Sequence, residues 1–360
     1  MYLINDYTTP GTKTKPEDAQ QMNRKEASFM NAGDDDYQRK IQQELAIYEK
    51  QVNVHDLPPI YRYWEGKYLT PLFLEAGFKT IPEFFSSNFL NAKNRTGSKK
   101  ANFVSIGAGN CDEEVSVAKN LINAGFQDFV LECMEINPTM LERGKILAKK
   151  SGVLKNMNFV EDDFNTWVAR KKYDGVMANQ SLHHVLKLEH LFDQIKSSLQ
   201  DDGSFVVSDM IGRNGHQRWP ESLEIVKKFW KELPESHKFN VLLNRLENEY
   251  ENWDCSKEGF EGIRSQDVLP CLLERFKCEK IISFGSAIDV FVDRCFGHNF
   301  DCKSARDREF IDRVHAEDEA GLMSGKLTPT HMLAVFVNTL HCRPYYSRGI
   351  DPVSLVRPPP

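Results

Sequence analysis

NFVSIGAGNCDEEVSVAKNLINAGFQDFVLECMEI, residues 102–136, is the stretch that decides the fold. It opens with a short apolar run that breaks at Gly107-Ala108-Gly109 and continues with apolar residues at helical spacing. A second apolar run follows and ends at the acidic Glu135. A strand, a glycine turn, a helix and a second strand in this order predict a β-α-β unit that binds a ligand at its first turn.

The residues after the glycine turn indicate which ligand fits it. A dinucleotide-binding turn has a third glycine at the position of Asp112. Asp112, Glu113 and Glu114 fall in the first helical turn, where carboxylates favour the helix dipole but repel a phosphate. S-Adenosylmethionine has an adenosine, an ammonium and a sulfonium but no phosphate, so this turn favours it over a phosphate-bearing cofactor.

Four segments in order resemble the class I, Rossmann-like S-adenosylmethionine-dependent methyltransferases. VSIGAGN is similar to the family's first motif, and Glu135 stands where an acid ends the second strand. Asp162-Asp163-Phe164 resembles the motif that holds the adenine, and residues 179–185 resemble the segment that reaches the methyl group. The resemblance spans about residues 101–337. It implies an α/β fold with a doubly wound, mostly parallel seven-stranded sheet and an antiparallel last strand.

The resemblance also implies a cofactor site. Backbone at the glycines would lie against S-adenosyl-L-methionine, Glu135 would bind both ribose hydroxyls, and Asp163 would take the exocyclic amine of the adenine. Phe164 would cover the ring or offer its backbone N–H. The residues expected at the cofactor are Gly107, Ala108, Gly109, Asn110, Glu135, Ile136, Asp163, Phe164, Asn179 and Gln180.

Three residues are candidates for the chemistry. Methyl transfer depends on positioning, and a base is needed only if the acceptor must lose a proton. His183 and His184, directly after the fourth strand, are the best candidates for this base, although both are equally compatible with packing near the cleft. Asp209, at the end of the fifth strand, would orient a histidine or a substrate hydroxyl, or cap the following loop.

Candidate substrate contacts lie outside the core motifs. An aromatic run in an N-terminal helical layer either covers one side of the sheet or closes over the cofactor. The loop after the fifth strand carries polar residues on the side of the methyl group, where loops on rigid scaffolds often hold function. The candidates are Tyr61, Tyr63, Trp64, Arg213, His216, Arg218 and His298.

Changes in composition divide the chain. We expect a mobile arm at 1–36, a helical layer at 37–100 ending in a linker at 91–100, and an extended tail at 341–360. The methyltransferase-like domain would span 101–340, with insertions at 210–265 and 286–330. Residues 238–250 are predicted to be helical.

Charge and composition limit the possible partners. The net charge of −6 and the absence of a basic arm argue against a nucleic-acid partner. No apolar run has the length of a membrane span, and no signal peptide is recognisable, so a cytoplasmic location is expected. The eight cysteines contain no C-x-x-C pair and no zinc spacing, so reduced thiols and no metal site are expected.

The sequence therefore predicts a cytoplasmic methyltransferase that acts on a small molecule. Oxygen of a hydroxylated, sugar-containing or natural-product substrate is the expected acceptor, while nitrogen and carbon stay open. Two alternatives remain: an NAD-dependent oxidoreductase, and a catalytically inactive module that binds S-adenosylmethionine. The oligomeric state is not predicted.

Overall fold

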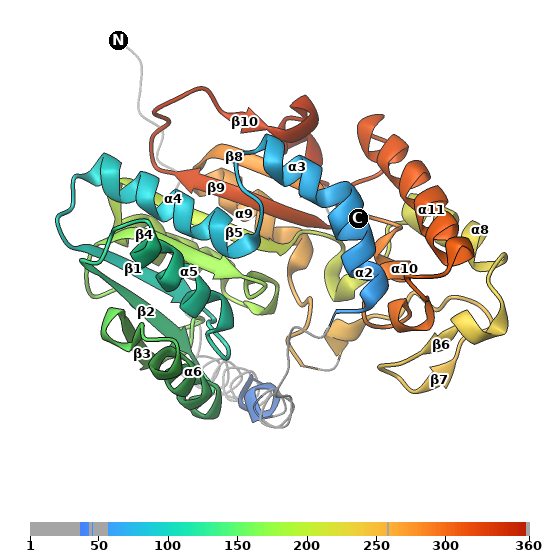
Figure 1. The fold of residues 1–360 in the computed structure, drawn as a ribbon, viewed down its shortest axis with the longest axis horizontal. Coiled ribbons are helices and arrows are strands. Elements are labelled where there is room, and N and C mark those ends of the chain that lie inside the picture. Colours follow the sequence, from blue (N-terminus) through green and yellow to red (C-terminus); the bar gives the residue numbers. More distant parts are fainter. Residues whose placement is uncertain (1–36, 43–44, 46–56, 258, 358–360) are drawn as a thin grey trace, which may run out of the picture.

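The computed structural model describes residues 37–42, 45, 57–257 and 259–357, which form an α/β fold around an eight-stranded sheet (Figure 1). The strand order is β10-β8-β9-β5-β4-β1-β2-β3. In chain order the strands are β1 (Ala101–Ile106), β2 (Phe129–Glu135), β3 (Met157–Glu161), β4 (Tyr173–Asn179), β5 (Leu199–Met210), β8 (Lys277–Phe284), β9 (His331–Val337) and β10 (Tyr345–Tyr346). The order reverses between β1 and β4, which makes their carboxyl ends the topological switch point where such sheets bind ligands.

The predicted doubly wound sheet is confirmed. Strands β1 to β5 are parallel, and β9 lies antiparallel between β5 and β8. The sheet has eight strands rather than the expected seven, because Tyr345 and Tyr346 pair with β8. The segment expected to be an extended tail is therefore held at the sheet edge, where it continues into 3₁₀ turns at Ser347–Gly349 and Pro352–Leu355.

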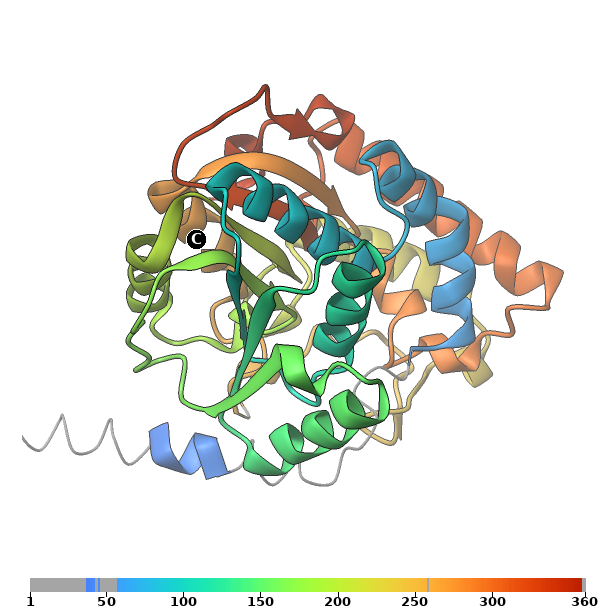
Figure 2. The same ribbon diagram turned by 60° about the vertical axis from the view of Figure 1, so that its left-hand side comes forward.

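Helices cover both faces of the sheet (Figures 1 and 2). Buried residues of α4 (Ile81–Thr96), α5 (Asp112–Asn123) and α6 (Pro138–Lys150) share one core with Phe103 and Val206 of the strands. Buried residues of α7 (Leu188–Ser198) and α9 (Ser265–Arg275) share the other with Val104 and Phe205. Neighbouring strand residues therefore point to opposite cores, as the two-residue period of a strand requires.

A second group of helices lies beside the sheet. Both ribbon views place α2 (Pro59–Trp64) and α3 (Thr70–Glu75) next to α11 (Ala305–Met323), and α8 (Pro220–Trp230) and α10 (Asp289–Val292) complete the group. A π-helical turn, Glu65–Leu69, joins α2 to α3. The N-terminal helices thus pack against an insertion from the second half of the chain.

The helix predicted at 238–250 is wrong. These residues form a hairpin of β6 (Phe239–Asn240) and β7 (Arg245–Leu246). The Asn240 side chain accepts a hydrogen bond from the Leu243 N–H at 3.0 Å and donates to Glu247 at 2.9 Å, which favours a turn over a helix. Leu242 is 63% exposed, so the apolar residues at helical spacing in this segment do not form a buried helical face.

The linker expected at 91–100 is also largely wrong, because α4 continues to Thr96 and ends at Gly97 with φ of +68°. Ala92 is fully buried, and Arg95 bonds to Ser204 and Glu279, so tertiary contacts hold the polar end of the helix. The expected arm at 1–36 lies outside the described residues. The helix expected from residue 37 is described at 37–42 and 45, where it is helical.

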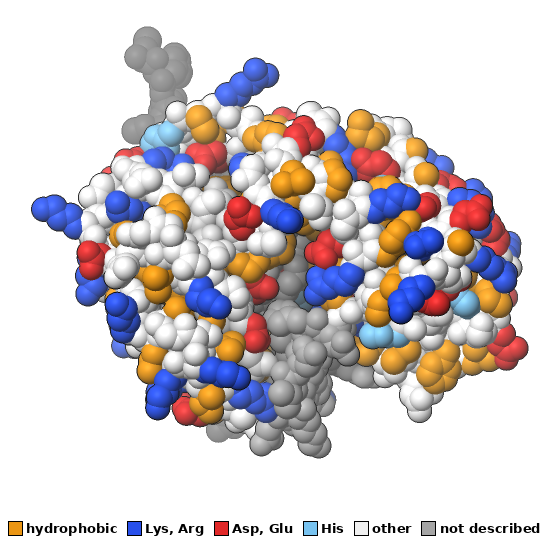
Figure 3. All heavy atoms as spheres, in the orientation of Figure 1, with side chains coloured by type: hydrophobic (Ala, Val, Ile, Leu, Met, Phe, Trp, Pro, Cys, Tyr) orange, Lys and Arg blue, Asp and Glu red, His pale blue; other side chains and the backbone are white. Residues whose placement is uncertain are grey.

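The surface drawn in Figure 3 carries Lys and Arg side chains interspersed with Asp and Glu. Exposed hydrophobic side chains of the β6–β7 hairpin include Phe239, Val241 and Leu246. Among the helices of the described residues, none combines the length and apolarity that crossing a membrane requires.

The first turn of α5 contains a carboxyl group that is buried within the fold. Glu114 is 3% exposed and accepts a hydrogen bond from the Ser105 hydroxyl at 2.6 Å. Burial raises the pKa of Glu114 to about 8. The folded state therefore binds this proton at pH values where the unfolded chain has released it.

We predict that the free energy of unfolding falls as the pH rises from about 4.5 to about 8, since the native state binds more protons than the unfolded state in this window. Glu114→Gln, which retains an acceptor for Ser105 but cannot ionise, should make the decline shallower. Urea titrations across this range measure the effect. Exposed Glu142→Gln is the control, and identical pH dependence in Glu114→Gln and the wild type would contradict the assignment.

Candidate active site

The glycine turn after β1 packs directly against the segment after β4. Gly107 has φ of +69°, and a Cβ there would lie 2.7 Å from the Cβ of Ser181. The Ser181 hydroxyl donates to the Ile106 carbonyl at 2.7 Å, which holds the two segments together. Only glycine fits at this contact, so the turn brings the backbone of the two strand ends into one site.

Glu135 is fixed beside this turn. Its Oε2 accepts the Gly109 N–H at 3.0 Å, and its Oε1 accepts the Asn137 N–H at 3.0 Å. A carboxylate oxygen can accept more than one hydrogen bond, so a carboxylate oriented in this way is of the type that binds a pair of neighbouring hydroxyls. This arrangement fits the sugar-binding acid that the sequence analysis expected.

Asp163 lies in the loop after β3 and contacts the N-terminal segment. Its Oδ1 accepts the Asn165 N–H at 2.8 Å, and its Oδ2 accepts the Tyr37 hydroxyl at 2.5 Å. The Tyr37 ring also packs edge-on against Phe260, with centroids 5.5 Å apart. Tyr37 was not a predicted site residue, yet it joins the N-terminal segment to the predicted adenine motif.

Other expected cofactor residues border the same strand ends. The N–H of Ala108 donates to the Met134 carbonyl at 2.8 Å, which ties the turn to β2. Gln180 has φ of +53°, and its N–H donates to the Ser208 carbonyl at 2.7 Å. Asn110 is buried, and a Cβ on Gly107 would lie 3.7 Å from the Phe164 ring. Ile136 follows β2, and Asn179 ends β4.

Asp209 joins the ends of β4 and β5. Its carboxylate is fully buried and accepts the backbone N–H groups of Ser181 and Leu182 at 2.9 and 2.7 Å. Its Oδ1 lies 2.7 Å from Nδ1 of His183 and also accepts the Met210 N–H. This contact orients the His183 ring and directs its Nε2 away from Asp209.

Three histidines surround Glu261, which the sequence analysis did not single out. Glu261 Oε1 lies 3.4 Å from Nε2 of His183 and 2.5 Å from Nε2 of His216. Glu261 Oε2 lies 3.4 Å from Nε2 of His184. The rings of His183 and His184 are 4.3 Å apart, and those of His183 and His216 are 5.3 Å apart. The predicted His183, His184 and His216 are thus brought together by one carboxylate.

Charge is distributed unevenly over this group. Burial lowers the pKa of His183, but Asp209 and Glu261 outweigh burial and raise it to about 10. Burial lowers the pKa of His216 despite its bond to Glu261. Although burial opposes it, the neighbouring histidines, His184 foremost, hold the pKa of Glu261 well below its usual range. At neutral pH His183 is an imidazolium between two carboxylates, and its Nε2 can accept a proton only when another group replaces Glu261.

A close approach of two backbones places His216 beside Glu261. The Gly215 N–H donates to the Gly262 carbonyl at 2.8 Å, and Gly262 has φ of +66°. A Cβ on Gly262 would lie 3.1 Å from the Gly215 nitrogen and 3.2 Å from the His216 ring. Arg218 holds the other side, because its Nη2 donates to the His216 carbonyl at 2.7 Å.

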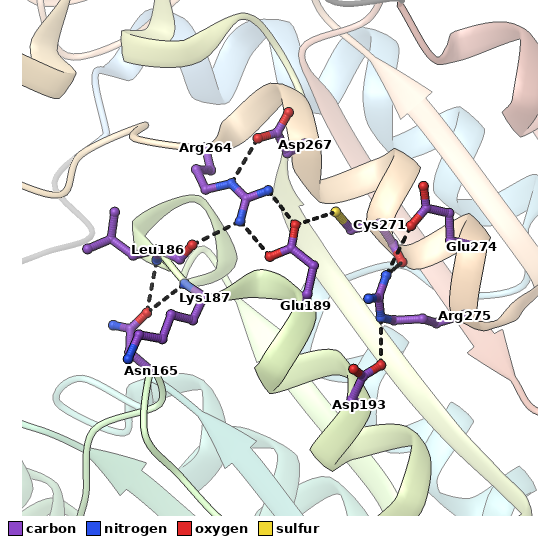
Figure 4. A network of polar contacts seen from close by, with 10 residues as sticks. All are labelled: Asn165, Leu186, Lys187, Glu189, Asp193, Arg264, Asp267, Cys271, Glu274 and Arg275. Carbon is purple, nitrogen blue, oxygen red and sulfur yellow. Dashed lines mark hydrogen bonds and ion pairs between the residues drawn. The ribbon is translucent and has the colours of Figure 1, made fainter. Parts of the chain in front are cut away.

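The loop that carries Glu261 is anchored by Arg264 (Figure 4). The guanidinium donates to both oxygens of Glu189 at 2.7 Å, to Asp267 at 2.8 Å and to the Leu186 carbonyl at 2.9 Å. Asn165 Oδ1 accepts the N–H groups of Leu186 and Lys187, which links this network to the loop of Asp163. Arg264 therefore fixes the Glu261 loop against the segment that follows β4.

The remaining predicted substrate residues have their side-chain contacts outside the histidine group, except that Arg218 also donates to the His216 carbonyl. The Tyr63 hydroxyl donates to Asp312 at 2.9 Å, and the Trp64 indole donates to His315 at 3.2 Å, so both side chains brace α2 against α11. Tyr61 packs edge-on against Trp64. The Arg213 guanidinium lies over the Trp219 ring. Arg218 pairs with Asp289 at 2.9 Å. His298 is exposed in a 3₁₀ turn.

Two segments of the site were missed for different reasons. Glu261 is 45 residues from His216 and 78 from His183 in sequence, and nothing in its own segment resembles a motif. Gly259 and Gly262 flank it, and the glycines were the available signal for a close backbone approach. Tyr37 is 126 residues from Asp163, and no pattern in the sequence around either residue predicts that contact.

A model of the methyltransferase domain family matches residues 98–264. This range includes the glycine turn, Glu135, Asp163, the histidines and Glu261. Malonyl-[acyl-carrier protein] O-methyltransferase 1 of Ilyobacter polytropus is 27% identical over 144 residues, which are 40% of this chain and 49% of that protein. The second malonyl-[acyl-carrier protein] O-methyltransferase of this organism is 24% identical over 52% of this chain and 67% of its own length. The chain thus spans about half of the first relative and two thirds of the second.

Solved structures of methyltransferases are similar at low sequence identity. The O-methyltransferase of a trans-AT PKS multienzyme of Brevibacillus brevis, in complex with S-adenosyl-L-homocysteine, is 11% identical with a TM-score of 0.41. The match covers 81% of this chain and 83% of that one. A putative sarcosine dimethylglycine methyltransferase from Galdieria sulphuraria is 14% identical with a TM-score of 0.39, over 71% of this chain and 85% of that one.

The sheet order, the glycine turn, the acid that ends β2 and the matching domain model agree with one another. S-Adenosyl-L-methionine is the cofactor of the family with these features. Residues 98–264 form a methyltransferase domain of the class I, Rossmann-like, S-adenosylmethionine-dependent type.

Proposed function

We propose that this protein transfers a methyl group from S-adenosyl-L-methionine to a hydroxyl oxygen of a small molecule. The observation that carries the proposal is the pair of Asp209 and His183, set at the carboxyl ends of β5 and β4 with Glu261 at the free edge of the ring. Ligands of doubly wound sheets bind at these strand ends. The pair is arranged to take a proton from a group that arrives there.

The residues for the cofactor are those of the glycine turn, Glu135 and the Asp163 loop. Glu135, held in place by the N–H groups of Gly109 and Asn137, would accept both ribose hydroxyls. Asp163 and Phe164 would contact the adenine, and Tyr37 would cover this end of the site from the N-terminal segment. The cofactor supplies an electrophilic methyl group on a sulfonium sulfur.

The chain's own contribution is to place the acceptor and remove its proton. A hydroxyl that displaces Glu261 from Nε2 of His183 lets the Nε2 proton leave with the Glu261 carboxylate to solvent. The neutral imidazole keeps its bond to Asp209, which supports the charge that the ring gains when it accepts the hydroxyl proton. The acceptor oxygen forms its bond to the methyl carbon as the carbon–sulfur bond breaks. The electron pair of that bond stays on sulfur, and the hydroxyl proton is left on His183.

An alcohol or phenol fits this site better than a carboxylate. The names of the two Ilyobacter relatives give an acyl carrier protein that bears a malonyl group, whose free carboxylate needs no base. In this chain a carboxylate would meet the anionic Glu261, and the His183–Asp209 pair would have no proton to remove. We therefore favour a hydroxylated metabolite, with sugar-containing and other natural products as the class to test first.

The alternative without turnover remains testable. A module that binds the cofactor but methylates nothing would keep the contacts of Glu135 and need no base. Incubation with methyl-labelled cofactor and a panel of hydroxylated metabolites distinguishes the two: label in a small-molecule product supports the proposal, and tight cofactor binding with no product from the panel supports the inactive module. Fluorescence titration with NADH tests the dinucleotide alternative, which the acids of the first α5 turn disfavour.

Replacement of Glu135 by alanine should weaken S-adenosylhomocysteine binding about ten- to a hundredfold, because two ribose hydrogen bonds worth about 0.5–3 kcal/mol each are lost. Calorimetric titration measures this effect. Glu249→Ala, on an exposed residue close to the hairpin, is the matched control. Equal affinity in Glu135→Ala and the wild type would remove Glu135 from the cofactor site.

Replacement of His183 by alanine should lower kcat by about 10²–10⁴-fold, the usual contribution of a positioned base. Affinity for S-adenosylhomocysteine should change little, since His183 contacts Asp209 and Glu261 rather than the predicted cofactor residues. His341→Ala, on an exposed histidine outside every predicted site, should retain wild-type turnover. Full activity of His183→Ala would leave positioning as the sole source of catalysis.

A further inference from the structure

Three histidines surround Glu261, which is more imidazole groups than one proton transfer requires. A suitable ligand atom from each of His183, His216 and Glu261 lies within 4.8 Å of the other two. His184 contributes a third imidazole, with Nε2 at 3.4 Å from Glu261. Each Nε2 atom lies on the Glu261 side of its ring, so the lone pairs of neutral imidazoles would converge on the carboxylate.

We propose that His183, His216 and Glu261 bind a divalent first-row transition metal ion, such as Zn²⁺, Fe²⁺ or Co²⁺. Two imidazoles and one carboxylate are a known ligand set for such ions, found both at catalytic zinc and at non-haem iron. Mg²⁺ and Ca²⁺ prefer sites made of oxygen atoms alone, so imidazole ligands select against them.

The spacing of the donors suits one ion. Ligand atoms at about 2.0–2.2 Å from a tetrahedral ion lie about 3.3–3.6 Å apart. Nε2 of His183 and Oε1 of Glu261 are 3.4 Å apart, which falls in this range. The 2.5 Å separation of Glu261 and His216 is that of a hydrogen bond, so it must lengthen as the ion replaces the shared proton.

The surroundings of the three residues also match a metal site. A histidine ligand commonly donates its other ring N–H to a carboxylate, which fixes the tautomer and aims the free lone pair at the ion. Asp209 takes this position at Nδ1 of His183, at 2.7 Å. The His216 backbone is held by Arg218 and by the Gly215–Gly262 contact, and the Glu261 loop is held by Arg264.

The group of His183, His216 and Glu261 is reached by solvent on the Glu261 side, and a catalytic ion requires such access. The His183 side chain is 4% exposed, whereas that of Glu261 is 40% exposed. Three protein ligands leave coordination positions for water or a substrate oxygen. Catalytic metal sites differ from closed structural sites in this feature.

The role of the ion rests on the proposed function. A hydroxyl bound to the ion loses its proton to solvent more readily, because the positive charge stabilises the alkoxide. Nε2 of His183 cannot hold the ion and accept a proton together. In the metal-bound enzyme His183 is therefore a ligand, and coordination replaces proton acceptance by the ring in activating the same acceptor.

Direct metal binding tests the inference without any acceptor. The full chain is stripped with a chelator, dialysed, and titrated with Co²⁺ and with Zn²⁺ by calorimetry. We expect one equivalent to bind, and Co²⁺ to give visible ligand-field bands without the near-ultraviolet band of cobalt–thiolate bonds. His216→Ala and Glu261→Gln should each weaken binding at least tenfold, and His341→Ala, on an exposed histidine outside the site, should not.

Thermal unfolding of each metal-free variant shows whether it folds, and the partly exposed Glu261 makes Glu261→Gln the safer of the two. The inference is overturned if the wild type binds no ion, if a thiolate band shows that cysteines hold it, or if the folded His216→Ala and Glu261→Gln variants bind like the wild type. Methylation that persists in a protein shown to bind no ion overturns this inference alone. An ion bound at these residues in a protein that methylates no acceptor overturns the proposed function alone.

Discussion

The buried carboxylate of Asp209 is the interaction on which the site depends. A carboxylate with no exposure to solvent is stable only if hydrogen bonds replace its hydration, and Asp209 obtains them from three backbone N–H groups and one imidazole. Two of these N–H groups belong to the segment after β4, while Asp209 itself belongs to β5. The Asp209 carboxylate therefore holds the segment of His183 against the neighbouring strand and also orients the His183 ring.

The second half of the site comes from loops outside the core strands. His216 follows β5, and Glu261 lies in the loop before α9. They meet because Gly215 and Gly262 allow two backbones to touch, and because Arg264 pairs with Glu189 at the start of α7. The core strands thus carry the predicted cofactor residues and His183, and the loops after β5 and before α9 carry the groups that complete the polar assembly around His183.

The core was predictable from sequence because its signals are local. The glycine turn, the acid ending β2 and the apolar strands are each readable within a few residues, and the sheet has the predicted connections. Local reasoning failed at 238–250, where the Asn240 side chain and a bond from Val241 to Cys295 stabilise a hairpin despite helical apolar spacing. It could not indicate the partners of Tyr63 and Trp64 on α11, which are about 250 residues away. Glu261 was missed for the same reason, because the three histidines that it contacts are far from it in the sequence.

A crystal structure of the full chain with S-adenosylhomocysteine and a bound Co²⁺ ion would test this account most directly. The account predicts the Glu135 carboxylate on both ribose hydroxyls and the cofactor sulfur directed toward the His183 side of the site. Anomalous scattering should place the cobalt between His183, His216 and Glu261. A Glu135 carboxylate far from the ribose, or a cofactor sulfur turned away from the histidines, would contradict the account of the site.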